Sequence, residues 1–201
     1  MSETASVDLR DGVAVEDPLT VVLGFIEEGW VQPSDPCRRA TFGESDLRRA
    51  NRGGARISTA EIAAILERRG AIERSLRAID PHASLTGAGG STPWLPLERL
   101  FDAFGNIRGV GLSKMTKALH PKRPALIPML DSVVQKYLAE DDLGARAPFA
   151  ERALGLVRGY KRDLDRNRKA VRSVQRELAR RGFTLTEVRI LDLLIWSVEG
   201  A

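Results

Sequence analysis

The stretch Ile107-Arg-Gly-Val-Gly-Leu-Ser-Lys114 decides how this chain is expected to fold. Its two glycines lie between segments of helical periodicity, which predicts a hairpin that joins two helices. Gly109 and Gly111 can adopt backbone angles that other residues avoid, and without side chains they let another molecule approach the backbone closely. The amide groups at the start of the second helix attract an anion. The stretch therefore predicts a binding site for phosphate.

Basic residues follow this hairpin and extend the candidate site. Lys114 and Lys117 lie on the predicted second helix, where they would attract phosphate at longer range. Contacts of this kind position a duplex without reading its sequence. In the next loop we expect His120 to be solvated or to face a phosphate rather than to bind a metal. The candidate DNA-binding residues are Arg108, Gly109, Val110, Gly111, Ser113, Lys114, Lys117, Lys122 and Arg123.

The sequence after the hairpin makes its interpretation more specific, because Gly109-Val-Gly111 taken alone is more simply a plain turn. The chain continues Leu126-Ile-Pro-Met-Leu-Asp-Ser-Val-Val-Gln-Lys-Tyr-Leu138. From Phe101 to Leu138 it resembles the helix-hairpin-helix DNA glycosylase superfamily, in which a Val-Asp or Leu-Asp pair opens the helix after the hairpin. Asp131 follows the second glycine by twenty positions, as in several branches of that superfamily. Pro128-Met-Leu-Asp-Ser-Val-Val resembles the adenine-specific mismatch branch.

The resemblance implies a role for Asp131 as the catalytic carboxylate. It would face the sugar of an extruded nucleotide and activate water or stabilise the developing positive charge. Members that cleave the strand use a lysine where this chain has Ser113, and Lys114 would point about 100° away. The implied enzyme is therefore a monofunctional N-glycosylase. Arg108 departs from the family by replacing a proline, and Asp131 is equally suited to cap a helix without any chemistry.

The composition limits the class of protein. The chain has 201 residues, of which 43% are hydrophobic and 29% charged, as in globular proteins. Residues 1–10 lack the features of a signal peptide and no apolar run is long enough to span a membrane, so we expect a cytoplasmic protein without membrane contact. Cys37 is the single cysteine, which excludes a four-cysteine iron–sulfur cluster within the chain. With two histidines, His82 and His120, we expect neither a metal nor a cofactor.

The periodicity predicts an all-α, glycosylase-like helical domain, since no convincing strand pattern is present. Asp17-Pro18 is a helix start, and Ser58-Thr-Ala-Glu61 and Thr184-Leu-Thr-Glu187 fit capping boxes. Residues 1–16 are polar and aperiodic, so we expect a disordered tail. Residues 17–201 would form one domain, or two small lobes with the hairpin and Asp131 at their junction.

One long helix is predicted from Phe149 to Arg181, a stretch that contains eleven Lys and Arg residues but only four Asp and Glu residues. Its apolar stripe is interrupted only by Asn167. The other side carries a basic stripe that is either a solvated face or a surface for nucleic acid. The basic stripe consists of Arg158, Arg162, Arg166, Lys169, Arg172, Arg176 and Arg180.

Three functions follow from these patterns. The first is base excision from DNA by a monofunctional glycosylase, and the second is DNA binding by a module of the same architecture without chemistry. The third is a protein-interaction role, in which residues Ala150 to Leu178 pair with a second copy as an antiparallel homodimer and Asn167 sets the register. Packing inside the chain's own domain explains the same apolar stripe more simply.

Overall fold

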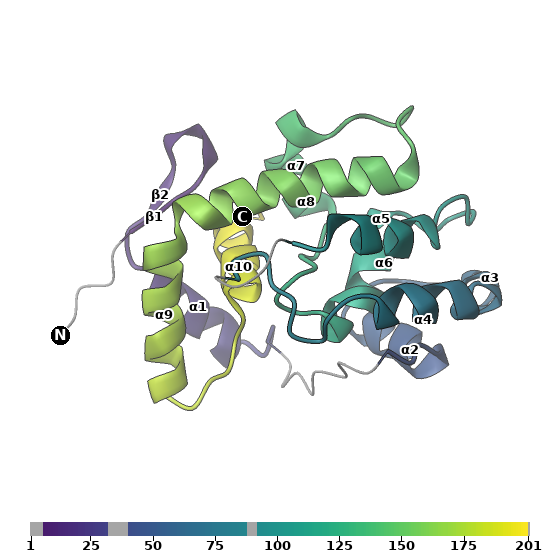
Figure 1. The fold of residues 1–201 in the computed structure, drawn as a ribbon. Helices are drawn as coiled ribbons and strands as arrows, with labels where there is room; N and C mark the ends of the chain where they lie inside the picture. The colour runs from purple at the N-terminus through teal and green to yellow at the C-terminus, as the bar shows by residue number, and fades with distance from the viewer. Residues whose placement is uncertain (1–5, 32–39, 88–91, 201) are drawn as a thin grey trace.

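The computed structural model describes residues 6–31, 40–87 and 92–200, and these are mostly helical (Figure 1). The predicted all-α class is correct for the body of the fold. The α-helices are α1 (Pro18–Glu27), α2 (Glu44–Arg52), α3 (Thr59–Glu67), α4 (Arg69–Arg77), α5 (Trp94–Asp102), α6 (Leu112–Leu119), α7 (Ser132–Tyr137), α8 (Phe149–Arg166), α9 (Arg168–Arg180) and α10 (Glu187–Glu199). Within the described residues, no helix is long and apolar enough to cross a membrane.

The helix starts follow from local capping groups. Asp17 accepts a hydrogen bond from the Thr20 amide at 3.2 Å, which stabilises the first turn of α1. Ser58 and Glu61 form the predicted capping box at α3. The predicted box at the last helix is displaced, because Thr186 rather than Thr184 caps α10 by accepting a bond from the Arg189 amide at 3.1 Å.

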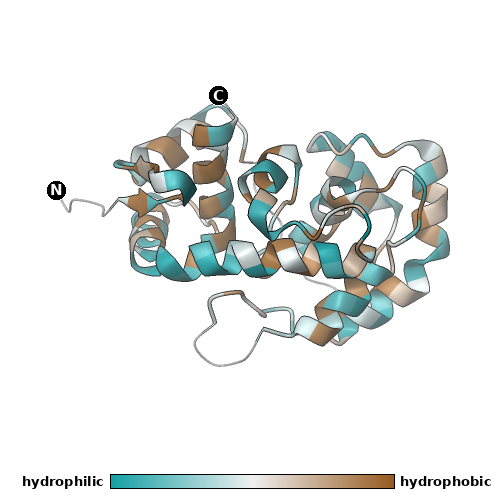
Figure 2. Cartoon of the chain, turned by 90° about the horizontal axis from the view of Figure 1, so that it is seen from above, coloured by the Kyte–Doolittle hydropathy of each residue, from teal (hydrophilic) through white to brown (hydrophobic). Residues whose placement is uncertain are grey.

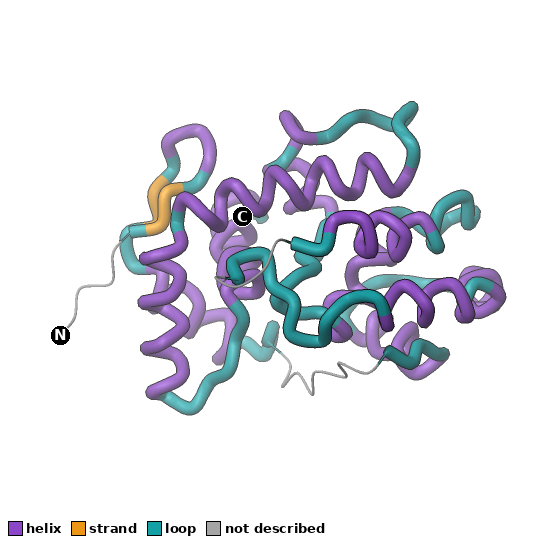
Figure 3. The backbone as a smooth tube through the Cα atoms, in the orientation of Figure 1, coloured by secondary structure: helices purple, strands orange, loops and turns teal. Residues whose placement is uncertain are grey.

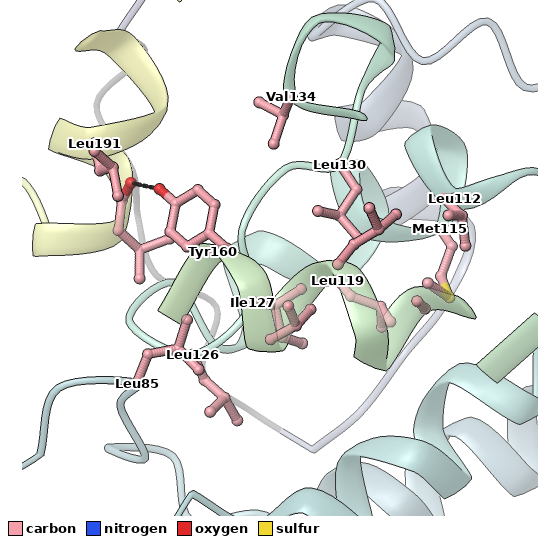
Figure 4. Packing of buried hydrophobic residues seen from close by; sticks show 14 of the residues in the cluster. Leu85, Leu112, Met115, Leu119, Leu126, Ile127, Leu130, Val134, Tyr160 and Leu191 are labelled. Atoms are coloured by element: carbon pink, nitrogen blue, oxygen red, sulfur yellow. Dashed lines mark hydrogen bonds between the residues drawn. The ribbon is translucent and has the colours of Figure 1, made fainter. Parts of the chain in front are cut away.

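Helix α8 connects the two ends of the molecule. Figure 1 shows α2 to α6 on one side and α1, α9 and α10 on the other, with α8 running between them. It packs against α5 and also contacts α10, while α7 packs on α10. Along the helices apolar and polar residues alternate with the period of an amphipathic helix (Figure 2). The buried apolar side chains form one continuous core, part of which is drawn in Figure 4.

The predicted long basic helix is wrong, because the chain bends at Asn167 into the separate helices α8 and α9. Asn167 exchanges two hydrogen bonds of 2.8 Å with the backbone of Asp8, and it donates a third, of 2.9 Å, to the Asp163 carbonyl. The apolar stripe faces the core of the same chain and offers no free surface for the predicted dimer. Its buried members include Ala150, Ala153, Val157, Tyr160, Leu164, Val171, Val174 and Leu178.

The expected disordered tail also needs correction. Residues 1–5 lie outside the described part, but β1 (Val7–Asp8) pairs antiparallel with β2 (Ala14–Val15) around a short 3-10 turn, as Figure 3 shows in orange. Arg10 fastens this turn, since its guanidinium donates to Asp141 at 2.6 Å and to Asp163 at 2.7 Å. The polar residues of the segment are therefore ordered by partners far along the chain.

Replacing Asn167 by alanine should destabilise the fold. The substitution leaves the buried polar groups of Asp8 and Asp163 without these partners, which costs roughly 2–3 kcal/mol. Urea unfolding measures the loss, and Lys169→Ala on the exposed side of α9 is the matched control, with an expected change below about 0.5 kcal/mol. Equal stabilities of the Asn167 variant and the control would contradict the anchoring role.

Candidate nucleic-acid interface

The turn between α5 and α6 holds the predicted hairpin. Gly109 has a positive φ of +82°, which favours glycine, and Val110 is buried beneath the turn. Gly111 is extended, with φ of −94° and ψ of −178°, and lies at the N-cap of α6 without a side-chain cap. The first amide groups of α6 therefore keep their capacity to bind an anion. Ser113 lies half-buried in this first turn.

A carboxylate from another helix covers this turn. Both oxygens of Glu61 accept hydrogen bonds from the Lys114 ammonium, at 2.7 and 2.8 Å, and one of them also accepts from the Ser58 amide at 2.8 Å. A Cβ atom at Gly109 would collide with the Glu61 carboxylate. The Lys114 ammonium, followed by the Ser58 amide, lowers the pKa of Glu61. An ionised carboxylate thus lies where the sequence predicts a phosphate.

Two further cations near the turn, Arg108 and Lys117, have no partner in the described part of the chain. Arg108 is exposed and Lys117 is half-buried, and neither makes an ion pair or hydrogen bond among the residues that the structure describes. Residues 106–117 contain Arg108, Lys114 and Lys117 but no acidic residue. Their positive charge is therefore compensated only where Glu61 meets Lys114.

The basic stripe of α8 and α9 behaves differently. Arg158 lies over the Trp94 ring, with 5.3 Å from its guanidinium carbon to the ring centroid. Four more members form ion pairs, namely Arg162 with Asp141, Arg166 with Asp163, Arg172 with Glu187 and Arg180 with Glu177. In the described part of the chain, Lys169 and Arg176 are the stripe members without a partner. The geometry favours a solvated, ion-paired face.

Two of the predicted DNA-binding cations are internal. Lys122 and Arg123 are each 1% exposed. Lys122 donates to the Thr41 carbonyl at 2.8 Å and pairs with Asp46 at 2.7 Å. Arg123 donates to the carbonyls of Leu76 and Ile79, at 2.6 and 2.9 Å, and so caps the end of α4. The prediction that these two side chains contact DNA is wrong, because both are buried and bind groups inside the fold, namely backbone carbonyls and, for Lys122, also Asp46.

His120 is also turned inward rather than solvated. Its Nδ1 lies 2.7 Å from the Ile127 carbonyl, to which the neutral ring donates. Burial, with a smaller effect from the nearby Arg189, lowers the pKa of His120 to about 4, so the ring is uncharged at neutral pH. The bond holds the loop that leads from α6 to Asp131.

Asp131 caps α7, as one of its two predicted roles requires. Its Oδ1 accepts bonds from the Val133 and Val134 amides at 3.1 Å, and its Oδ2 accepts from the Trp196 indole at 3.0 Å. The residue is 7% exposed. The two best-defined surface pockets, of about 540 and 370 Å³, are lined by other residues. This geometry favours capping over catalysis, although the catalytic role stays a prediction.

Sequence reasoning missed Asp192, which lies beside this cap. It is 1% exposed, and its Oδ1 has no hydrogen-bond partner among the residues that the structure describes. Burial, with a smaller effect from the neighbouring Asp131, outweighs the opposing effects of Arg189 and the Tyr160 hydroxyl and raises the pKa of Asp192 to about 7. Tyr160 itself donates to the Val188 carbonyl at 2.6 Å (Figure 4). An aspartate within the apolar run from Ile190 to Ile195 was the available signal.

Residues 28–199 match the model of DUF6308, which is described as a family of unknown function, so the chain belongs to this family. No curated protein and no solved structure matches the chain. The matched region contains α2 to α10 and hence the hairpin and Asp131, whereas β1, β2 and α1 precede it. The family description names no ligand.

Replacing Gly109 by alanine should destabilise the protein by roughly 2–3 kcal/mol. About 1–2 kcal/mol arises because other residues avoid the positive φ, and the remainder because Glu61 must move. Gly111→Ser is the control, since serine suits an extended N-cap and nothing lies within 4 Å of the Cβ position there. Urea unfolding of both variants tests this, and an equal loss at the two glycines would contradict it.

Replacing Asp192 by asparagine should change how stability depends on pH. The folded chain holds the proton up to a pKa of about 7, whereas the unfolded chain releases it near the ordinary value of 3.8. The contribution of Asp192 to wild-type stability therefore falls as the pH rises through this interval, and asparagine removes that fall, which amounts to roughly 4 kcal/mol at most. Urea unfolding at pH 5 and pH 8 measures it.

His120→Asn is the companion control, because its effect has the opposite sign. The unfolded chain takes up a proton below the ordinary pKa of 6.5, but the folded chain does so only near 4. The contribution of His120 to wild-type stability is therefore lost as the pH falls from 6.5 to 4. Variants whose stability differs from wild type by a constant amount at all pH values would contradict both assignments.

Proposed function

We propose that this member of the DUF6308 family binds double-stranded DNA through its phosphate backbone, without excising a base. The contact surface is the turn from Arg108 to Gly111 with the first turns of α6, including Ser113, Lys114 and Lys117. The observation that carries the proposal is the positive charge of residues 106–117, which contain three cations and no acidic residue, and of which only Lys114 is paired in the described part of the chain, with Glu61. By contrast, most of the basic stripe on α8 and α9 is already ion-paired.

The backbone of the turn supports a phosphate as the ligand. The N-cap of α6 provides no side chain for the free amides of its first turn, and the helix dipole favours negative charge at this end. Gly111 is exposed and nothing lies within 4 Å of the position that its Cβ would take, so a nucleic-acid strand can approach the main chain closely there. Contacts with the backbone alone predict binding that is independent of base sequence.

The Glu61 carboxylate supports the same chemistry. It is an anion held against Gly109 and Lys114 by the fold itself, at the place where a phosphate would neutralise the same lysine. A bound phosphate therefore competes with Glu61 for Lys114, while Arg108 and Lys117 remain free to contact it. Glutamine at position 61 would keep the capping box of α3 and remove the competing charge.

The geometry of Asp131 favours DNA binding without base excision. Base excision needs a carboxylate that faces the sugar of an extruded nucleotide. Both oxygens of Asp131 accept bonds from within the protein, and the residue is almost fully buried. Asp131 then serves the fold by joining α7 to α10, and the hairpin binds DNA without a reacting group beside it.

Reversing the charges of Arg108 and Lys117 to glutamate should weaken binding to a 20-base-pair duplex of mixed sequence. We expect at least about a tenfold loss of affinity and a decrease of about 2 in the slope of log K against log salt, since each phosphate contact contributes about 0.9. Fluorescence anisotropy between 50 and 200 mM NaCl measures both quantities.

The double reversal Lys169→Glu and Arg176→Glu on α9 is the matched control. It changes the net charge from +4 to 0, as the first pair does, but lies away from the hairpin (Figure 1). Its effect on affinity should stay below about threefold, and Glu61→Gln should tighten binding. Absence of wild-type binding at 50 mM NaCl, or equal losses from the two reversals, would refute the proposal.

A further inference from the structure

We infer that the turn between α2 and α3, residues 52–58, is a second element that contacts the DNA backbone. This inference rests on the proposed function of the hairpin and extends its surface to a separate part of the chain. The two turns together would contact neighbouring phosphates of one duplex. We call residues 52–58 the arginine turn, after Arg52 and Arg56.

The arginine turn lies beside the hairpin. Helix α2 packs against α6, and the Lys117 ammonium lies 3.8 Å from the position that a Cβ atom would take at Gly54. From the other end of the turn, Glu61 on α3 reaches Lys114 on α6. The arginine turn and the first turns of α6 are therefore joined at two points and form one surface.

The two arginines of the arginine turn have no partner within the described part of the fold. Arg52 and Arg56 are exposed, and neither makes a hydrogen bond, ion pair or ring contact with any part of the chain that the structure describes. Residues 52–60 contain no acidic residue. With the cations of residues 106–117, the two adjoining segments carry five positive charges, and Glu61 is the acidic residue that pairs with one of them. A polyanion is the partner that this surface fits.

The turn is also held in one conformation. The Asn51 side chain donates to the Ile57 carbonyl at 2.9 Å and accepts from the Ile57 amide at 2.6 Å. Ala55 and Ile57 are buried and anchor the backbone from below. A fixed turn loses little freedom when a ligand binds, which favours affinity for each contact made.

The backbone at Arg56 argues in the same direction. Its φ is +55°, a region that glycine adopts easily and arginine does not. The fold alone would be served better by glycine at this position, as at the preceding Gly54 with φ of +77°. An exposed arginine without a partner in a strained conformation fits a role outside the folded chain.

The experiment measures the affinity of full-length variants for the same mixed-sequence duplex, together with their stability in urea. Arg52→Ala with Arg56→Ala should lower the affinity at least about fivefold at 100 mM NaCl and reduce the salt slope by about 2. Arg56→Gly alone should lower the affinity without lowering the urea midpoint, because glycine relieves the positive φ. A lower affinity for DNA together with an unchanged or higher urea midpoint excludes a merely structural effect.

Each outcome separates the two proposals. If the wild type binds and the Arg108 and Lys117 variant is weakened while the arginine-turn variants bind as wild type does, the hairpin function stands and this inference is overturned. If the wild type does not bind the duplex at 50 mM NaCl, both are overturned. A loss of affinity in Arg52→Ala with Arg56→Ala that equals the loss in Lys169→Ala with Arg176→Ala on α9, which removes the same charge, reflects net charge alone and also overturns the inference.

Discussion

The contact of the Glu61 carboxylate with Gly109 and Lys114 is the constraint on which the proposed surface depends. The same side chain completes the first turn of α3, so a helix start, a tight turn and an ion pair are fixed together. Glycine at position 109 is required twice, for its positive φ and for the space that the carboxylate fills. This contact places the arginine turn beside the hairpin and makes one surface from segments about fifty residues apart.

Cations in this protein have two separate physical uses. Inside the fold, Arg123 caps the carbonyls at the end of α4, and Arg10 joins the first strand pair to acidic groups near α8. Such buried charges are retained only with partners. On the outside, Arg52, Arg56 and Arg108 are exposed beside Lys114 and Lys117, and a surface of this charge gains most from a phosphate backbone.

The sequence predicted what depends on local pattern. The helical class, the capping box at Ser58 and the turn at Gly109 follow from residues within a few positions of one another, and Asp131 fulfils the capping role that its place before a helix suggested. The bend at Asn167, the strand pair near the N-terminus and the burial of Lys122 depend on partners from 76 to 159 residues away. Spacing and periodicity carry no information about such contacts. The charged residues Lys122 and Arg123 were therefore predicted to lie at the surface, although the fold buries them.

Amide chemical-shift mapping of the isotope-labelled protein during titration with duplex DNA tests the central claim most directly, because it locates the contact without a substitution. The account predicts that the largest shifts occur at Gly109, Gly111 and Ser113, with further shifts at Gly54 and Arg56. Shifts confined to α9, or no shifts at protein and duplex concentrations of about 100 μM and low salt, would contradict it.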